Sequence, residues 1–275
     1  MLKSTVVSAM LVSAVLAACA PAPSPEVAEA KADQKADQDT GLSWTPLFPQ
    51  DGEVKDGWIV RHWADVSKPV DRPATWEVRD GILYGVGRLS GGGKGTEHPY
   101  SHSTWAGSWL LSEREYDDFI LETEFRFQGD GERGNGGIAL RAPLRGDPAY
   151  DGIELQITDE RYERSLYPNA DSDEMTGALY LLSAPAKLAY RPGEWNRYRV
   201  EARGPRIRVW LNGERVQDVD LSTMTAPARR HGQGTEMLPA APGKDRPLRG
   251  HVGFQDLSDS GETLLFRNAR IAELK

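Results

Sequence analysis

The fold is decided by the stretch Asn135-Gly-Gly-Ile-Ala-Leu-Arg141, which a polar loop separates from Gly152-Ile-Glu-Leu-Gln-Ile-Thr-Asp159. Both segments alternate with a period of two, and their apolar positions are Ile138, Leu140, Ile153, Leu155 and Ile157. Such alternation is typical of strands that place one face on a core and leave the other face open. We therefore expect two β-strands here, each with an apolar side and a polar side.

The polar sides of these two strands form the candidate site. If the strands pair, Arg141, Glu154 and Gln156 converge on the open face. Gly137 and Ala139 lie on the same face and leave room for a ligand. The alternative is a structural one, in which Arg141 and Glu154 form a cross-strand ion pair on a solvated face.

The rest of the folded region also reads as β-structure. Asp80-Gly81 and Asn212-Gly213 each lie between alternating segments and are strong signals for β-hairpins. The charged positions that alternate with apolar ones in residues 119–127 are interpreted as a solvated face. Because no stretch has a sustained helical period, we expect an all-β sandwich of two antiparallel sheets over residues 42–275.

The first residues indicate a targeting signal. An apolar run from Val6 to Leu16 ends in Leu16-Ala-Ala-Cys19, which resembles a bacterial lipobox. We expect residues 1–18 to be a signal peptide and Cys19 to carry the lipid, with an ordinary secretory signal as the alternative. Residues 19–41 are rich in Ala, Pro, Glu, Lys, Asp and Gln and read as a disordered tether. This predicts a lipid-anchored protein of the cell envelope, at the outer membrane or in the periplasm.

Charge and cysteine content exclude other classes. The formal net charge of −8 argues against nucleic acid as a partner. Cys19 is the single cysteine, so no intrachain disulfide can form.

Two long segments interrupt the pattern. Residues 90–107 contain three consecutive glycines, His98, His102 and Trp105, and Trp109 follows. We interpret this segment as a loop at the rim of the site, with aromatic rings that stack on a sugar; packing of the rings in the fold is the alternative. Pro99 separates the two histidines and argues against a metal site there. Residues 222–249 form the second segment, and loops of that length are usually functional or disordered.

A series of motifs resembles the 3-keto-disaccharide hydrolase family, which has a concanavalin-like jelly-roll fold. The motifs occur in this order: Asp80-Gly-Ile-Leu, Tyr116-Asp-Asp-Phe, Asn135-Gly-Gly-Ile with Arg141, Gly152-Ile-Glu-Leu-Gln, Thr176-Gly-Ala-Leu-Tyr, Gly193-Glu-Trp-Asn, Trp210-Leu-Asn-Gly, Gly253-Phe-Gln-Asp and Phe266-Arg-Asn. The chain departs from the family pattern at Gly136, at Leu257-Ser258 and in its two long segments.

The resemblance implies cleavage of glycosides that are already oxidised at C3 of the sugar. The C3 ketone acidifies the hydrogen at C2, so a base can remove it, and the C1 oxygen then leaves by elimination before water adds. On this reading Glu154 is the base, Arg141 stabilises the oxyanion and Asp159 is a second base candidate. The expected substrate contacts are Asn135, Gln156, Tyr180, Gln255, Arg267, Trp105, Trp109 and His102.

Several alternatives accompany this hypothesis. A retaining glucanase is disfavoured because Gln156 occupies the place where a second carboxylate would be needed. A non-catalytic, lectin-like carbohydrate-binding module on the same fold is the main rival. No cofactor is expected, although Asp256, Asp259 and Glu262 are candidate ligands for calcium, with an acidic surface loop as the alternative.

Overall fold

The computed structural model describes residues 41–70, 75–86, 107–128, 134–159, 172–231, 236–257 and 263–275. Ser43 to Lys275 form one compact unit. The predicted signal peptide, Cys19 and the tether up to residue 40 lie outside the described residues. Within these ranges no helix has the length and apolar character needed to cross a membrane.

The unit is built almost entirely from short strands. These are β1 (Trp44–Pro46), β2 (Gly52–Glu53), β3 (Trp58–His62), β4 (Thr75–Arg79), β5 (Ile82–Val86), β6 (Ser108–Tyr116), β7 (Phe119–Gln128), β8 (Asn135–Ala142), β9 (Ile153–Thr158), β10 (Asn196–Arg203), β11 (Arg206–Leu211), β12 (Glu214–Asp220), β13 (Ala228–His231), β14 (Met237–Ala240), β15 (Gly250–Asp256) and β16 (Thr263–Glu273). The helices are α2 (Pro148–Asp151) and three short 3-10 helices, η1 (Ser172–Glu174), η2 (Leu221–Thr223) and η3 (Gly243–Asp245).

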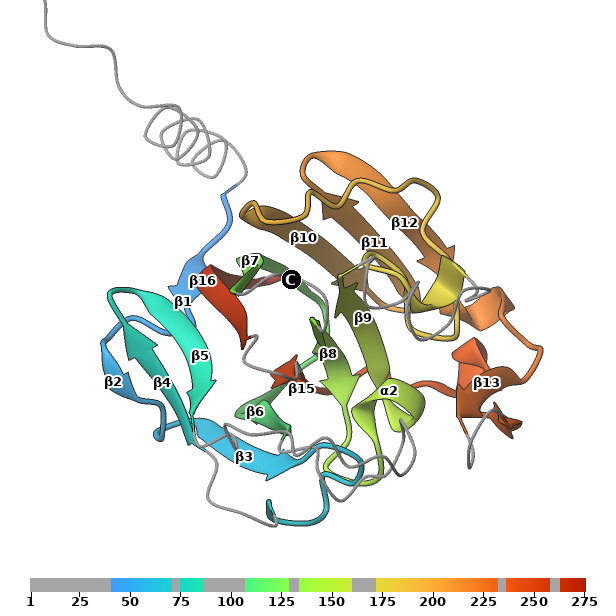
Figure 1. The fold of residues 1–275 in the computed structure, drawn as a ribbon. Coiled ribbons are helices and arrows are strands. Elements are labelled where there is room, and N and C mark those ends of the chain that lie inside the picture. The colour runs from blue at the N-terminus through green and yellow to red at the C-terminus, as the bar shows by residue number, and fades with distance from the viewer. Residues whose placement is uncertain are drawn as a thin grey trace, which may run out of the picture. The chain divides into compact units, whose positions relative to one another are not determined.

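The strands make two main antiparallel sheets (Figure 1). The nine-stranded sheet has the order β12-β11-β10-β7-β16-β5-β4-β2, with β1 also paired to β16. The five-stranded sheet has the order β3-β6-β15-β8-β9. β13 and β14 form a separate hairpin within the segment 222–249 that the sequence singled out. The predicted all-β jelly-roll sandwich of two antiparallel sheets is confirmed.

The core lies between the two sheets and contains the apolar side chains of the alternating strands. Ile138, Leu140 and Leu155 from the five-stranded sheet belong to the same buried cluster as Leu121 and Phe125 of β7. The residues between them in sequence therefore lie on the outer face of each sheet. β8 and β9 pair, which meets the condition set in the sequence analysis, with Gly137 opposite Gln156 and Ala139 opposite Glu154.

Both hairpins signalled by the sequence are present. Asp80 and Gly81 have φ of 51° and 73°, and Asn212 and Gly213 have φ of 52° and 84°. Two successive residues with positive φ are the mark of a type I′ turn, whose twist matches that of the paired strands. The turns join β4 to β5 and β11 to β12.

The outer face of the nine-stranded sheet differs from the predicted solvated face. The side chain of Glu122 is only 4% exposed and accepts hydrogen bonds from Arg197, Arg199 and Arg270. Burial by itself would raise the pKa of Glu122, but hydrogen bonds and charge from these three arginines outweigh it and hold the pKa below its usual value. Glu122 is therefore the anionic centre of an arginine cluster.

We expect Glu122→Gln to lower the free energy of unfolding by about 2 kcal/mol, because three guanidinium groups lose their anion but can still be partly rehydrated. The folded pKa of Glu122 lies below the unfolded one, so its stabilisation is present at neutral pH and is lost as the pH falls through the folded pKa. Urea unfolding of both proteins at neutral and acidic pH measures this difference. A difference that stayed constant or grew in acid would contradict the assignment.

Candidate active site

The outer face of the five-stranded sheet brings together most of the predicted site residues. Strand register aligns one row across this face: Arg61 on β3, Trp109 on β6, Gln255 on β15, Gly137 on β8 and Gln156 on β9. The adjoining row ends in Ala139 and Glu154. The sheet thus assembles a site from strands that are up to about 190 residues apart in sequence.

The carboxyl group of Glu154 lies over Gly137. A Cβ atom at position 137 would come within 2.2 Å of Glu154 Oε1, so only glycine leaves space for the carboxyl group here. With its amide oriented to satisfy both neighbours, Gln255 donates to Glu154 Oε1 at 3.1 Å and accepts from Trp109 Nε1 at 3.1 Å. Glu154 is 5% exposed. Its burial, and next the negative charge of Asp147, raise the pKa of Glu154 well above its usual value.

Tyr180 joins Glu154 on the same face. Residues 177–180 run along the free edge of β9, and the Tyr180 amide donates to the Glu154 carbonyl at 2.9 Å. Leu179 is bridged to Leu155 and lies in the core, so the neighbouring Tyr180 is directed to the outer face. Asn135 opens β8 on this face too, opposite Thr158. The Gln156 side chain accepts from the Ile157 amide at 3.1 Å.

Trp109 lies in the site but not as a stacking surface. Its side chain is 0% exposed and packs in a buried cluster with Val66. Its single Nε1–H is shared between the Trp63 carbonyl, at 3.0 Å, and the Gln255 amide oxygen. The expectation that Trp109 stacks on a sugar is therefore wrong for this structure, and the packing alternative holds.

A second group of side chains was not predicted from the sequence. Asp147 caps α2 by accepting from the Ala149 amide at 3.0 Å, and it is close enough to raise the pKa of Glu154. Loss of solvation is the main cause that raises the pKa of Asp147 itself to about 7. The only local signal was the helix start Asp147-Pro148, a cap residue followed by proline. It predicts a helix but no catalytic role.

Tyr150 of α2 and the β13 hairpin complete this group. The Tyr150 hydroxyl accepts from the His231 amide at 3.3 Å, and the guanidinium of Arg230 lies 4.9 Å from the Tyr150 ring centroid. His231 contacts Glu174 at 3.3 Å and the ring of Tyr180 at 6.2 Å between centroids. Burial is the main cause that raises the pKa of Tyr150, so its hydroxyl stays protonated. Asp147, Tyr150, Tyr180 and His231 are all part-exposed, which makes their side of Glu154 the accessible one.

Arg141 does not face Glu154, and its predicted role as oxyanion stabiliser is corrected. Ala139 on β8 is paired with Gly253 on β15, and Ala142 is paired with His251. Two residues of β8 and only one of β15 lie between these pairs, so β8 contains a β-bulge. Arg141 has φ of 55°, is 0% exposed, and leaves the outer face. It donates to the carbonyls of Asp117 at 2.7 Å and Gly204 at 2.6 Å, and to Asp118 Oδ1 at 3.1 Å. Arg141 therefore ties the β6–β7 turn to the β10–β11 turn at one end of the sandwich.

Two further predicted residues lie elsewhere. Asp159 accepts from Tyr190, whose ring stacks on the core residue Phe125, so its carboxyl group is on the core side of the sheet. Arg267 belongs to the other sheet, where it donates to Glu124 at 2.6 Å and covers Trp195 at 4.2 Å. Neither residue is brought to Glu154. His102 and Trp105 lie outside the described residues.

The proposed calcium ligands are only partly described. Asp256 accepts from the Leu264 amide at 3.0 Å, whereas Asp259 and Glu262 fall in the undescribed range 258–262. In the described part of the chain, no three His, Cys, Asp or Glu side chains gather in a way that could hold a metal ion.

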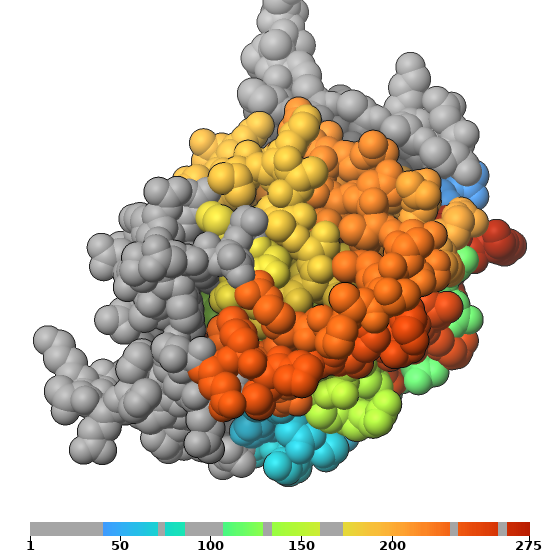
Figure 2. Space-filling model, turned by 90° about the vertical axis from the view of Figure 1, so that its right-hand side faces the viewer, coloured from blue at the N-terminus to red at the C-terminus, as the bar shows by residue number. Residues whose placement is uncertain are grey.

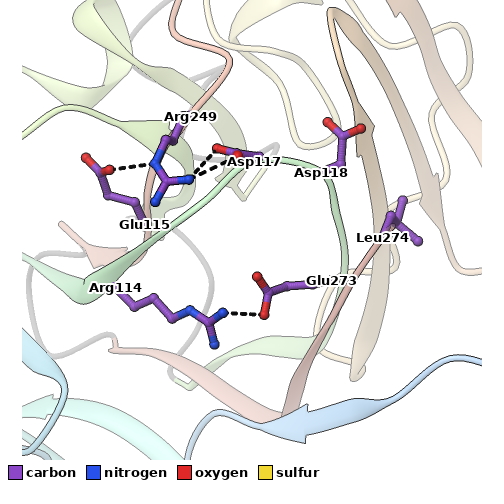
Figure 3. Close-up of a pocket in the computed structure, with 7 residues that line it drawn as sticks. All are labelled: Arg114, Glu115, Asp117, Asp118, Arg249, Glu273 and Leu274. Atoms are coloured by element: carbon purple, nitrogen blue, oxygen red, sulfur yellow. Dashed lines mark hydrogen bonds and ion pairs between the residues drawn. The ribbon is translucent and has the colours of Figure 1, made fainter.

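A cavity of about 410 Å³ lies at the opposite end of β6 from Trp109 (Figure 3). Ion pairs line it: Arg249 with Glu115 at 2.9 Å and with Asp117 at 3.0 Å, and Arg114 with Glu273 at 2.5 Å. The arginines in this cavity are already matched by carboxylates, and none of the residues that face Glu154 line it.

Comparisons with known proteins agree on one family. The sequence profile described as the 3-keto-alpha-glucoside-1,2-lyase-like domain matches residues 43–272. A 3-keto-disaccharide hydrolase of Bacteroides thetaiotaomicron is 25% identical over 243 residues, which cover 80% of this chain and 77% of that protein. Two crystal structures of candidate glycosyl hydrolases from Parabacteroides distasonis share the fold. The first has a TM-score of 0.60 at 23% identity, and the match covers 84% of this chain and 100% of the matched chain. The second has a TM-score of 0.57 at 20% identity, and the match covers 87% of this chain and 97% of the matched chain.

We expect Arg141→Gln to lower the free energy of unfolding by about 3 kcal/mol, because two buried carbonyls and Asp118 lose a charged donor. Arg61→Gln is the matched control. Arg61 Nε is buried without a hydrogen-bond partner, and no ion pair of Arg61 is found among the described residues. Chemical denaturation should therefore leave the control close to the unmutated protein. Equal stability of the two variants would contradict the structural role of Arg141.

Proposed function

Because this chain belongs to the 3-keto-alpha-glucoside-1,2-lyase-like domain family, we propose that it cleaves glycosides whose sugar carries a ketone at C3, such as 3-keto-disaccharides. The observation that carries the proposal is the placement of Asp147 close enough to Glu154 for its charge to raise the pKa of that group, next to Tyr150, with burial as the main cause that raises the pKa of all three. Such perturbed acids are characteristic of proton-transfer sites.

The two carboxyl groups are suited to different steps. Glu154 is buried, and burial raises its pKa and favours its protonated form, so we assign it the role of the acid. Asp147 has a pKa of about 7 and is ionised in a large fraction of molecules, so it acts as the base. This reverses the role that the sequence suggested for Glu154, because burial and its charged neighbour could not be read from the strand pattern.

The proposed reaction begins with elimination. The Asp147 carboxylate removes the proton at C2, and the electron pair of that C–H bond forms an enediolate with the C3 ketone. The C1–O bond then breaks, and the leaving oxygen takes the proton of Glu154. The products are an unsaturated 3-keto sugar and the free alcohol, with Asp147 protonated and Glu154 ionised.

Hydration restores the starting state. Water adds at C1 while Glu154 accepts one of its protons, and Asp147 returns its proton to C2. The sum of both steps is hydrolysis of the glycoside, and release before hydration makes the enzyme a lyase. Hydrolysis uses the two carboxyl groups in exchanged roles in its second step, because addition of water is the reverse of elimination with water in place of the alcohol. In the lyase outcome the two groups exchange protons with solvent to regain their starting states.

Tyr150 is placed to stabilise the enediolate. Its oxygen already accepts the His231 N–H, so the hydroxyl hydrogen is left to donate to another acceptor. The positive charge of Arg230, over the Tyr150 ring, favours negative charge nearby. These groups take the part that the sequence analysis gave to Arg141.

Gln255 and Gly137 position the acid. Glu154 and Gln255 are each no more than 5% exposed, so the carboxyl group has little freedom to turn away. The approach of a sugar is then from the part-exposed side of α2, Tyr180 and β13.

We expect Glu154→Gln to reduce turnover of a 3-keto-glucoside at least a hundredfold, because the leaving oxygen loses its proton donor. Glu124→Gln on the nine-stranded sheet is the control and should retain full activity. Product release, followed by chromatography, measures both. If the unmutated protein bound the sugar but released no product, the carbohydrate-binding alternative would replace this proposal.

We also expect kcat/KM to rise as the pH increases through about 7, because the base must be ionised and the pKa of Asp147 is about 7. Asp147→Asn should remove this rise together with most of the activity. A pH–rate series between pH 5 and 9 tests the assignment. A rate that falls as the pH rises through 7 would show that the group must be protonated, contrary to a base.

A further inference from the structure

A second cavity, of about 420 Å³, lies beside the candidate active site. Its wall is formed by the turn at Leu181 and Leu182, by η1 through Asp173, and by residues 223–229. Most of the lining side chains are apolar, and Asp173 and Arg229 add one charged pair. A volume of this size is within the range of small-molecule sites, and an apolar cavity of about 150 Å³ already holds one benzene ring.

The elements that line this cavity also supply the active-site cluster. In each of three elements, one residue lines the cavity, and another residue one or two positions away in sequence belongs to the group around Tyr150 and Tyr180. The three pairs are Asp173 and Glu174 in η1, Leu181 and Tyr180 in the turn, and Arg229 and His231 in β13. In Figure 2 the yellow surface of residues 172–195 is bordered by the orange surface of the chain that includes β13 and β14. The cavity is thus adjacent to the proton-transfer group.

The wall of the cavity is held in a defined shape. Arg229 donates to both oxygens of Asp173, at 2.8 and 2.7 Å. This pair fixes β13 against η1 and places a donor group and an acceptor group at the cavity wall. Both side chains remain partly exposed, at 39% and 18%.

Leu181 is strained. It is buried with φ of 51°, a conformation that costs a non-glycine residue roughly 1–2 kcal/mol. Its amide donates to the Asp173 carbonyl at 3.0 Å, which helps to hold it there. Strained residues of this kind cluster at ligand-binding sites.

We propose that this cavity binds the leaving group of the glycoside, and that it selects leaving groups with an apolar ring face and a hydroxyl group. This inference rests on the proposed function, since the leaving oxygen is the one that Glu154 protonates. The apolar lining takes the ring face, and the Arg229–Asp173 pair takes the hydroxyl group. The cavity of Figure 3 has a similar volume, but it is lined mainly by ion pairs and has no such connection to Glu154.

Filling the cavity tests the proposal. Ala226 is exposed and lines the cavity, so Ala226→Phe adds a ring at the wall with little effect on the core. We expect this variant to raise KM for a phenyl 3-keto-glucoside roughly tenfold or more and to leave KM for the methyl 3-keto-glucoside unchanged.

Leu274→Trp in the cavity of Figure 3 is the matched control and should change neither value. Thr225→Trp on the same wall repeats the test, with the thermal unfolding midpoint as the check on folding.

Binding without reaction separates this inference from the proposed function. Calorimetry with unoxidised phenyl and methyl glucosides of the same anomeric configuration should show tighter binding of the phenyl compound, and Ala226→Phe should remove the difference. If that holds while the unmutated protein turns over neither 3-keto-glucoside, the proposed function fails and the cavity assignment stands. If filling the cavity changes neither the KM nor the affinity for the phenyl compound, the cavity assignment is overturned.

Discussion

The carboxyl group of Glu154 occupies space that a Cβ atom at position 137 would fill, and the chemistry of the site depends on this contact. Glycine at 137 lets the group lie flat against the sheet within reach of Gln255, where water is excluded. Exclusion of water raises the pKa of Glu154, and the nearby charge of Asp147 raises it further. Burial of this kind favours the protonated form of the glutamate, which is why we propose that Glu154 is a proton donor.

The two sheets have different roles. The nine-stranded sheet neutralises buried Glu122 with three arginines and closes the core, so its outer face contributes to stability. The five-stranded sheet and the segments along its β9 edge carry Glu154, Asp147 and Tyr150, whose pKa values are raised mainly by burial. Substitutions on the outer face of the nine-stranded sheet are therefore expected to change stability and to leave the chemistry unchanged.

Alternation along the strands was sufficient to predict the sandwich and the face that carries Glu154, Gln156 and Gln255. It failed at Arg141 because a one-residue bulge reverses the side on which a residue lies, and a bulge leaves no mark in a pattern of period two. It failed at Arg267 because a local pattern does not tell to which sheet a strand belongs. Asp147, Tyr150 and His231 were missed because a four-residue helix and an isolated hairpin bring them to Glu154, and neither has a periodic signal.

We propose that Asp147 removes the C2 proton and that Glu154 protonates the leaving oxygen. The most direct measurement is deuterium uptake at C2 of a 3-keto-glucoside in heavy water, catalysed by Glu154→Gln and compared with buffer alone. We expect this variant to exchange the C2 hydrogen still faster than buffer alone does, because Asp147 remains, while cleavage of the C1–O bond is lost. Loss of both exchange and cleavage in this variant would contradict the assignment of Asp147 as the base and would return that role to Glu154.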